Sequence, residues 1–192
     1  MIAIGISGPS GAGKTILSER LQTKIKDCRL IQEDWFFIDP DLCTPDANYY
    51  DLKYLHLKEF ITDVQALING QEVIVPVINY YTFKRTNKLR KIIPGNILIV
   101  EGMTIFRIPE IVELLGRKYY LAPKMEIIRQ RKMDRDLKER NKQIEIILNQ
   151  LKWVETKYLI DLATLPSDVQ IFHDCEIIDL VAKKILLQVI HL

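Results

Sequence analysis

Gly8-Pro9-Ser10-Gly11-Ala12-Gly13-Lys14-Thr15 follows an apolar run, residues 2–6, and precedes a segment with helical periodicity that begins at residue 16. The segment matches Gly-x-x-x-x-Gly-Lys-Ser/Thr in full, and it has the strand before it and the helix after it that this pattern requires. Its glycines allow backbone angles that are closed to other residues, so successive N–H groups can turn inward and cradle phosphate oxygens. The following helix directs its positive end at the same place. We therefore predict a phosphate-binding loop over residues 8–15.

Two side chains of this loop predict contacts with the phosphates and the metal ion of a bound nucleotide. Lys14 supplies a mobile cation for the outer phosphates, and the Thr15 hydroxyl can ligate Mg²⁺. The alternative is a glycine-rich turn between a strand and a helix that binds no ligand, which the agreement of every fixed position disfavours. The other loop residues of the candidate nucleotide site are Gly8, Ser10, Gly11, Ala12 and Gly13.

The composition is that of an ordinary globular protein, and we expect one domain over residues 1–192. Charged residues make up 27% of the chain, and the net charge of +2 is too small to indicate a nucleic-acid or membrane partner. The three cysteines, Cys28, Cys43 and Cys175, are far apart in the sequence, so we expect free thiols in a cytoplasmic protein. We see no signal peptide and no apolar run long enough to span a membrane.

Apolar strand candidates alternate with helical patterns along the chain, which predicts an α/β fold with a doubly wound parallel sheet of about five strands flanked by helices. Residues 38–50, which include Thr44-Pro45-Asp46, have a loop composition. Residues 79–91 are aromatic and basic without a period, and we expect a loop or flap there. The strand candidates are residues 2–6, 29–32, 73–78 (at an edge or a strand end because of Pro76), 96–102, 118–121 and 168–172. The first helix candidate starts at residue 16. The others cover residues 57–68, 105–115, 124–142 and 176–190. A further helix is expected to place Ile144, Ile147, Leu148 and Leu151 in the core.

Glu101 ends the apolar run 97–100, and a buried strand end does not carry a carboxylate without a partner. In a chain with a phosphate loop, the partner that we expect is the Mg²⁺ held by Thr15. The alternative is that Glu101 caps the next helix.

A basic stripe is expected on the helix over residues 124–142, where Arg131, Arg135, Lys138 and Lys142 fall at offsets 0, 4, 7 and 11. Cations aligned in this way repel one another unless an anion neutralises them. The stripe therefore indicates phosphate contact, although a solvated charged face would have the same sequence pattern.

With these residues placed, the chain resembles the uridine kinase branch of the P-loop kinases, which includes the nicotinamide riboside kinases. The resemblance implies transfer of the γ-phosphate of ATP or GTP to the 5′-hydroxyl of a ribonucleoside, with Mg²⁺, under a helical lid near residues 124–145. It runs over nearly the whole chain and is carried by residues 8–15, 32–37, Pro76 followed by Arg85, 99–102 and 135–140.

The resemblance also implies roles for individual residues. Asp34 stands where the family has the carboxylate that accepts the hydroxyl proton, and Glu101 matches the acid associated with Mg²⁺. Arg131, Arg135 and Arg140 lie in the lid, where arginines neutralise charge on nucleotide and transferring phosphoryl group. We thus expect Asp34, Lys14, Arg131 and Arg135 to be catalytic, Arg140 to contact the nucleotide, and Thr15, Glu101 and Asp34 to surround the metal.

On the acceptor side, Tyr50 and Asp51 look like the pair that contacts the sugar hydroxyls in riboside kinases, and Phe37 like the aromatic residue beside the base. Tyr80 and Arg85 complete the predicted substrate site. The chain departs from uridine kinases after Pro76, where Ile78, Asn79 and Phe83 replace polar residues. Asn141 stands in place of a lid glycine.

We therefore expect a kinase whose partner is a small nucleoside, uridine or cytidine first and nicotinamide riboside or another small metabolite as the alternative. A nucleotide-dependent regulatory protein without catalysis is a further alternative. The guanine motif Asn-Lys-x-Asp of GTPases is replaced by residues 87–90, in which the last position is Arg90. No nucleic-acid-binding module is recognised, and a homo-oligomer stays open.

Overall fold

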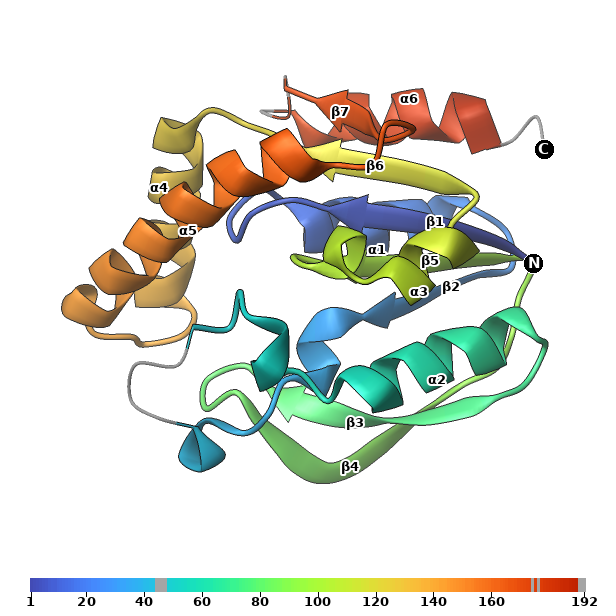
Figure 1. The fold of residues 1–192 in the computed structure, drawn as a ribbon, viewed down its shortest axis with the longest axis horizontal. Helices are drawn as coiled ribbons and strands as arrows, with labels where there is room; N and C mark the ends of the chain where they lie inside the picture. Colours follow the sequence, from blue (N-terminus) through green and yellow to red (C-terminus); the bar gives the residue numbers. More distant parts are fainter. Residues whose placement is uncertain (44–47, 174, 176, 190–192) are drawn as a thin grey trace.

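The computed structural model describes residues 1–43, 48–173, 175 and 177–189 (Figure 1). Within that part of the chain, five parallel strands form the central sheet in the order β2-β5-β1-β6-β7. This confirms the predicted parallel sheet. The strands are β1 (Ile2–Ser7), β2 (Cys28–Gln32), β5 (Ile97–Gly102), β6 (Arg117–Leu121) and β7 (Gln170–Phe172).

Helices cover both faces of this sheet, as a doubly wound fold requires. On one face Leu17 and Leu21 of α1 and Ile185 of α6 pack in one apolar cluster with β1. On the other face Phe60 of α2 and Ile111 of α3 belong to a second cluster. The α-helices of the described residues are α1 (Lys14–Lys24), α2 (Leu57–Ile68), α3 (Pro109–Leu114), α4 (Met125–Lys138), α5 (Ile144–Thr164) and α6 (Ile178–Val189).

Short 3₁₀ turns lead the chain away from the carboxyl ends of two neighbouring strands. The turn η1 (Glu33–Phe36) follows β2 directly, and η4 (Ile105–Arg107) comes soon after β5. Two more turns, η2 (Pro40–Leu42) and η3 (Leu52–Tyr54), lie in the connection between β2 and α2. The arrows of β1 and β6 in Figure 1 point toward the side of the molecule where α4 lies. Ligands of open α/β sheets bind at this edge.

The segment predicted as a loop or flap at residues 79–91 is mostly a strand, so that prediction was wrong. β4 (Lys84–Ile92) pairs antiparallel with β3 (Val73–Asn79) in a sheet separate from the central one. Most side chains of β4 are exposed or half-buried, so its sequence has no apolar alternation, and backbone pairing with β3 makes it a strand. Pro76 is tolerated at a shift in the β3–β4 register.

Two predicted helices have different limits in the structure. The helix expected over residues 105–115 is divided into η4 and α3, because Pro109 cannot continue a preceding helix and instead starts a new one. The helix expected to reach residue 142 ends at Lys138, and Asn141 has a left-handed φ of 48°. Arg140 and Lys142 therefore follow the helix, and the basic stripe does not continue along it.

In α5 only half of the predicted apolar face is in the core, since Ile147 and Leu151 are buried whereas Ile144 and Leu148 are about half exposed. The closing helix begins at Ile178, and the predicted ends of that helix at residues 176 and 190, like residues 44–46, lie outside the described residues. Among the described residues no helix has the length and apolar character to cross a membrane.

Candidate active site

A cavity of about 1220 Å³ lies between the phosphate loop, η1, the β3–β4 hairpin and the lid, by which we mean α4, the segment after it and α5. It brings together most of the residues predicted for the site, although they come from segments up to 130 positions apart. The predicted residues that line it are Ser10, Gly11, Gly13, Lys14, Thr15, Asp34, Phe37, Tyr50, Tyr80, Glu101, Arg131, Arg135 and Arg140.

The phosphate loop has the backbone that its glycines predicted. Gly13 has a φ of 99° at the start of α1, and a Cβ atom there would lie 2.7 Å from the Ile178 side chain. Gly11 has a φ of 93°, and its Cβ would approach the Ile128 carbonyl oxygen to 2.9 Å. Backbone conformation and packing therefore both demand glycine at these two positions.

The metal corner, which we define as Lys14, Thr15, Gln32 and Glu101, lies where β5 and β2 end. The Thr15 hydroxyl donates to Glu101 Oε2 at 3.3 Å, and the Gln32 amide donates to the same oxygen at 2.8 Å. Lys14 Nζ lies 3.9 Å from Glu101 Oε1. Burial raises the pKa of Glu101 to about 7, and the Lys14 charge opposes that effect. A buried carboxylate beside a threonine hydroxyl fits Mg²⁺, which would take the place of the proton.

The described residues contain no cluster of three or more His, Cys, Asp and Glu side chains that could hold a metal ion by themselves.

The two acidic residues of η1, which directly follow β2, have different surroundings. Glu33 is fully buried and accepts hydrogen bonds from the backbone N–H of Thr104, at 3.0 Å, and from its hydroxyl. Burial raises the pKa of Glu33. Asp34 is half-buried and lines the cavity, and no hydrogen bond or ion pair among the described residues engages its carboxylate. Glu33 thus anchors the turn, and Asp34 is available to a ligand.

The lid cations surround a carboxylate that lies in the 135–140 segment but was not predicted as a site residue. Asp136 is fully buried, and within the described chain it forms ion pairs with Lys132 (2.6 Å), Arg135 (2.9 Å), Arg140 (3.4 Å) and Lys142 (3.5 Å). Burial alone would raise the pKa of Asp136, but the charges of Arg135 and Lys132 outweigh this effect and hold the pKa below its ordinary value. The i, i+4 spacing of Lys132, Asp136 and Arg140 is the signal that could have found this cluster.

This cluster lies against the phosphate loop. Arg135 Nη2 donates to Ser10 Oγ at 3.1 Å, and Arg131 Nη1 donates to the Ala12 carbonyl oxygen at 3.3 Å. The lid therefore adds positive charge to the side of the loop that faces the cavity, where a nucleotide's phosphates would need it.

Aromatic residues of the hairpin form the other wall. The Arg140 guanidinium lies 4.8 Å from the Phe83 ring centre and 5.8 Å from that of Tyr80. Trp35 Nε1 donates to the Tyr80 hydroxyl at 3.3 Å, and this hydroxyl donates to Gln32 at 3.4 Å. Side-chain hydrogen bonds thus connect the hairpin to the metal corner through Gln32.

Comparison with known proteins decides the family. A family model described as the phosphoribulokinase / uridine kinase family matches residues 39–161. The chain belongs to this family. A uridine kinase from Borrelia duttonii (strain Ly) is 31% identical over 157 residues, which cover 77% of this chain and 73% of the relative. A uridine kinase from Clostridium perfringens (strain 13 / Type A) is 28% identical over 155 residues, which cover 78% and 74%.

Solved structures of other kinases share the fold of this family member. A protein described as a fructose transport system kinase from Silicibacter sp. TM1040 superimposes with a TM-score of 0.70 at 19% identity, over 89% of both chains. A D-glycerate 3-kinase from Cryptococcus neoformans superimposes with a TM-score of 0.62 at 12% identity, over 90% of this chain and 85% of the other. Family membership makes the protein an ATP-dependent phosphotransferase of P-loop kinase fold.

Two residues predicted for the acceptor site of this kinase do not line the cavity. The Asp51 side chain accepts from the backbone N–H of Lys53 at 3.1 Å and caps η3. Arg85 forms a bidentate pair with Glu59, at 2.9 and 3.3 Å, on the side of β4 that faces α2. In this structure the neighbours of each side chain hold it away from the space for a substrate.

Two loop residues, Gly8 and Ala12, also stand behind the cavity wall. A Cβ atom on Gly8 would meet the Leu121 carbonyl oxygen at 2.6 Å, and Ala12 is fully buried. Their predicted part in nucleotide binding is therefore limited to the backbone.

Proposed function

We propose that the protein is a nucleoside kinase that transfers the γ-phosphate of ATP or GTP to the 5′-hydroxyl of a ribonucleoside. The observation that carries this proposal is the Asp34 carboxylate, which lines the same cavity as the phosphate loop and the lid cations. Uridine and cytidine are the first candidates, because the relatives at 28–31% identity are named uridine kinases.

Different residues of the cavity have different roles in phosphoryl transfer. The backbone amides of the loop and Lys14 hold the triphosphate, and Arg131, Arg135 and Arg140 neutralise charge that develops on the transferring group. Asp34 orients the acceptor hydroxyl and takes its proton. Thr15 and Glu101 would hold Mg²⁺, which supplies further charge neutralisation when it is bound.

The acceptor would lie between Asp34 and the aromatic wall. Phe37, Tyr80 and Phe83 offer faces on which a flat base can stack, whereas the hairpin presents few polar groups to read the edge of a pyrimidine. Nicotinamide riboside or another small alcohol is therefore the second candidate acceptor.

A panel assay of ADP release tests this proposal. Purified protein with MgATP is mixed in turn with uridine, cytidine, adenosine, guanosine and nicotinamide riboside, and ATP is then replaced by GTP. We expect one or more nucleosides to stimulate turnover, and a Lys14→Ala variant prepared in the same way to show none. Stimulation only by RNA or by a protein would contradict the proposal, and stimulation only by an alcohol that is not a nucleoside would favour the second candidate over a nucleoside acceptor.

A further inference from the structure

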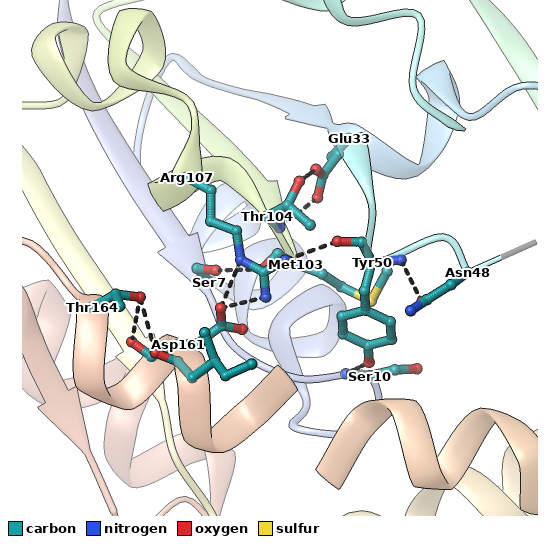
Figure 2. Close-up of polar contacts among 11 residues, drawn as sticks. Ser7, Ser10, Glu33, Asn48, Tyr50, Met103, Thr104, Arg107, Asp161 and Thr164 are labelled. Atoms are coloured by element: carbon teal, nitrogen blue, oxygen red, sulfur yellow. Dashed lines mark hydrogen bonds and ion pairs between the residues drawn. The ribbon is translucent and has the colours of Figure 1, made fainter. Parts of the chain in front are cut away.

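A backbone amide of the phosphate loop donates to a side chain that comes from outside the loop. The backbone N–H of Ser10 donates to the Tyr50 hydroxyl at 3.0 Å, and Figure 2 shows the phenol ring directed at Ser10. Tyr50 was expected to contact a sugar, together with Asp51. Its hydroxyl instead lies at the phosphate end of the cavity, beside an amide of the anion-binding loop.

Tyr50 is held firmly in this position. Its side chain is buried, with 6% of the residue exposed, in a cluster with Tyr120, Val154 and Tyr158. Its backbone N–H donates to Asn48 Oδ1 at 3.0 Å. The ring therefore cannot leave the loop without disrupting a buried cluster.

A partly buried ion pair fixes the other side of the Tyr50 backbone. The Tyr50 carbonyl oxygen accepts from Arg107 Nη1 at 2.8 Å, and Arg107 Nε donates to Asp161 of α5 at 2.7 Å (Figure 2). Since α5 is part of the lid, these bonds connect the lid through Tyr50 to the phosphate loop. The hydroxyl is thus placed before any ligand arrives.

The phenolic hydrogen is free to bind a ligand. The oxygen is an acceptor for Ser10, and no group of the described residues accepts its hydrogen, while Tyr50 lines the cavity. Burial raises the pKa of Tyr50, so the hydroxyl keeps its proton and acts as a donor. Arg135 and Asp34 line the same cavity as Tyr50, and their charges act in opposite directions on the pKa of its hydroxyl.

We propose that Tyr50 is a catalytic residue that donates its phenolic hydrogen bond to a non-bridging oxygen of the phosphoryl group in transfer. The phenol stays protonated, so no bond at Tyr50 forms or breaks. The transferring group carries its charge spread over these oxygens as it moves from nucleotide to acceptor, and a preorganised neutral donor stabilises that charge. The proposal rests on phosphotransferase activity and holds for whichever acceptor the panel identifies.

Tyr50→Phe tests this role because it removes the hydroxyl and keeps the ring. We expect kcat to fall about tenfold to a hundredfold, the effect of one hydrogen bond to a charged group. The acceptor KM and the Kd for ADP should stay within about twofold. Tyr158→Phe is the matched control: it removes another hydroxyl of the same cluster, which donates to the Pro123 carbonyl oxygen at 3.1 Å outside the cavity. It should keep kcat within about twofold of the wild-type value.

A second measurement needs no acceptor and separates this proposal from the identity of the substrate. A non-hydrolysable ATP analogue should bind Tyr50→Phe about threefold or more weakly than it binds the wild type, with ADP binding unchanged. A kcat within about twofold of the wild type would overturn the proposal. So would equal weakening of the analogue and of ADP, since that result would mean that Tyr50 only supports the loop. If no nucleoside is accepted but the analogue discriminates, the proposed acceptor class fails and the role of Tyr50 stands.

Discussion

Consecutive carboxylates in η1 have opposite surroundings, and this difference suits Asp34 to act on an acceptor. Both oxygens of Glu33 are occupied by Thr104, and burial favours its neutral form. Asp34 lies one residue further along a 3₁₀ turn, where successive side chains point about 120° apart, so it faces the cavity instead. The first carboxyl therefore sets the position of the second.

Asp34→Asn should lower kcat by about 10²- to 10⁴-fold, because the amide has no negative charge with which to attract and accept the proton of the acceptor hydroxyl. The Kd for ADP should change by less than about threefold, since the loop that holds the phosphates is untouched. Steady-state kinetics and calorimetric titration measure the two effects. Asp41→Asn removes an exposed carboxylate that pairs with Lys84 and should leave both values at the wild-type level. Near-normal turnover of Asp34→Asn would exclude the assigned role.

Asp63 on α2 links the stability of the protein to pH. Its Oδ2 is buried without a hydrogen-bond partner among the described residues, and burial, followed by the Glu59 charge, raises its pKa from 3.8 to about 6. Between these values the unfolded chain releases the proton and the folded chain keeps it. Stability therefore falls as pH rises through this window, and the loss is complete above about pH 6.

Asp63→Asn should remove that loss because asparagine does not ionise. We expect the variant to be more stable than the wild type by about 1 kcal/mol at pH 7.5, with the difference smaller at pH 4. Urea unfolding at the two pH values measures it. Glu113→Gln, which removes an exposed carboxylate of α3, should show no such pH-dependent gain. An equal difference at both pH values would show that packing, not ionisation, distinguishes the Asp63 variant.

At the scale of elements, Asp136 lets α4 carry a dense positive charge. Lys132 and Arg135 belong to the helix, whereas Arg140 and Lys142 return to the same carboxylate after the helix ends at Lys138. The left-handed Asn141 between them allows this reversal of the chain. The anion that balances these cations is therefore part of the protein, and it holds them ready for a phosphate ligand.

Asp136→Asn leaves these cations without their buried anion, so we expect a loss of about 3–5 kcal/mol in the free energy of unfolding. The lid should also separate from the hairpin, with lower affinity for nucleotide. Asp134→Asn is the control on the same helix: its pair with Lys138 is exposed and should cost less than about 1 kcal/mol. Denaturant unfolding with and without ADP measures both variants. A loss from Asp136→Asn no larger than that of the control would disprove the central role of this carboxylate.

Across the whole molecule, the features predicted from sequence are those that a short segment determines by itself. β1, the phosphate loop and the run before Glu101 were predicted because strands buried on both faces are apolar throughout and glycines mark the turn. β4 was missed because only its pairing with β3 makes it a strand. Asp51 and Arg85 were assigned to the acceptor through the family resemblance, but their directions depend on Lys53 and Glu59, which no motif includes.

The metal corner joins the loop, β2 and β5, so its occupation should be visible in the stability of the whole protein. A ligand at about 100 times its Kd stabilises the native state by about 2.7 kcal/mol. For a chain of this length that corresponds to a rise of about 5–10 °C in Tm. We expect MgATP to give a rise of this size and ATP with EDTA to give a smaller one.

Glu101→Gln separates the contribution of the metal from that of the nucleotide. Glutamine can still accept the hydrogen bonds of Thr15 and Gln32, but it is a much weaker ligand for Mg²⁺. The variant should therefore gain as much Tm from ATP in EDTA as the wild type and little more when Mg²⁺ is added. Differential scanning calorimetry at fixed protein concentration measures the four conditions. If Mg²⁺ raises the Tm of Glu101→Gln as much as that of the wild type, the ion binds without Glu101, and the metal corner has to be assigned elsewhere in the cavity.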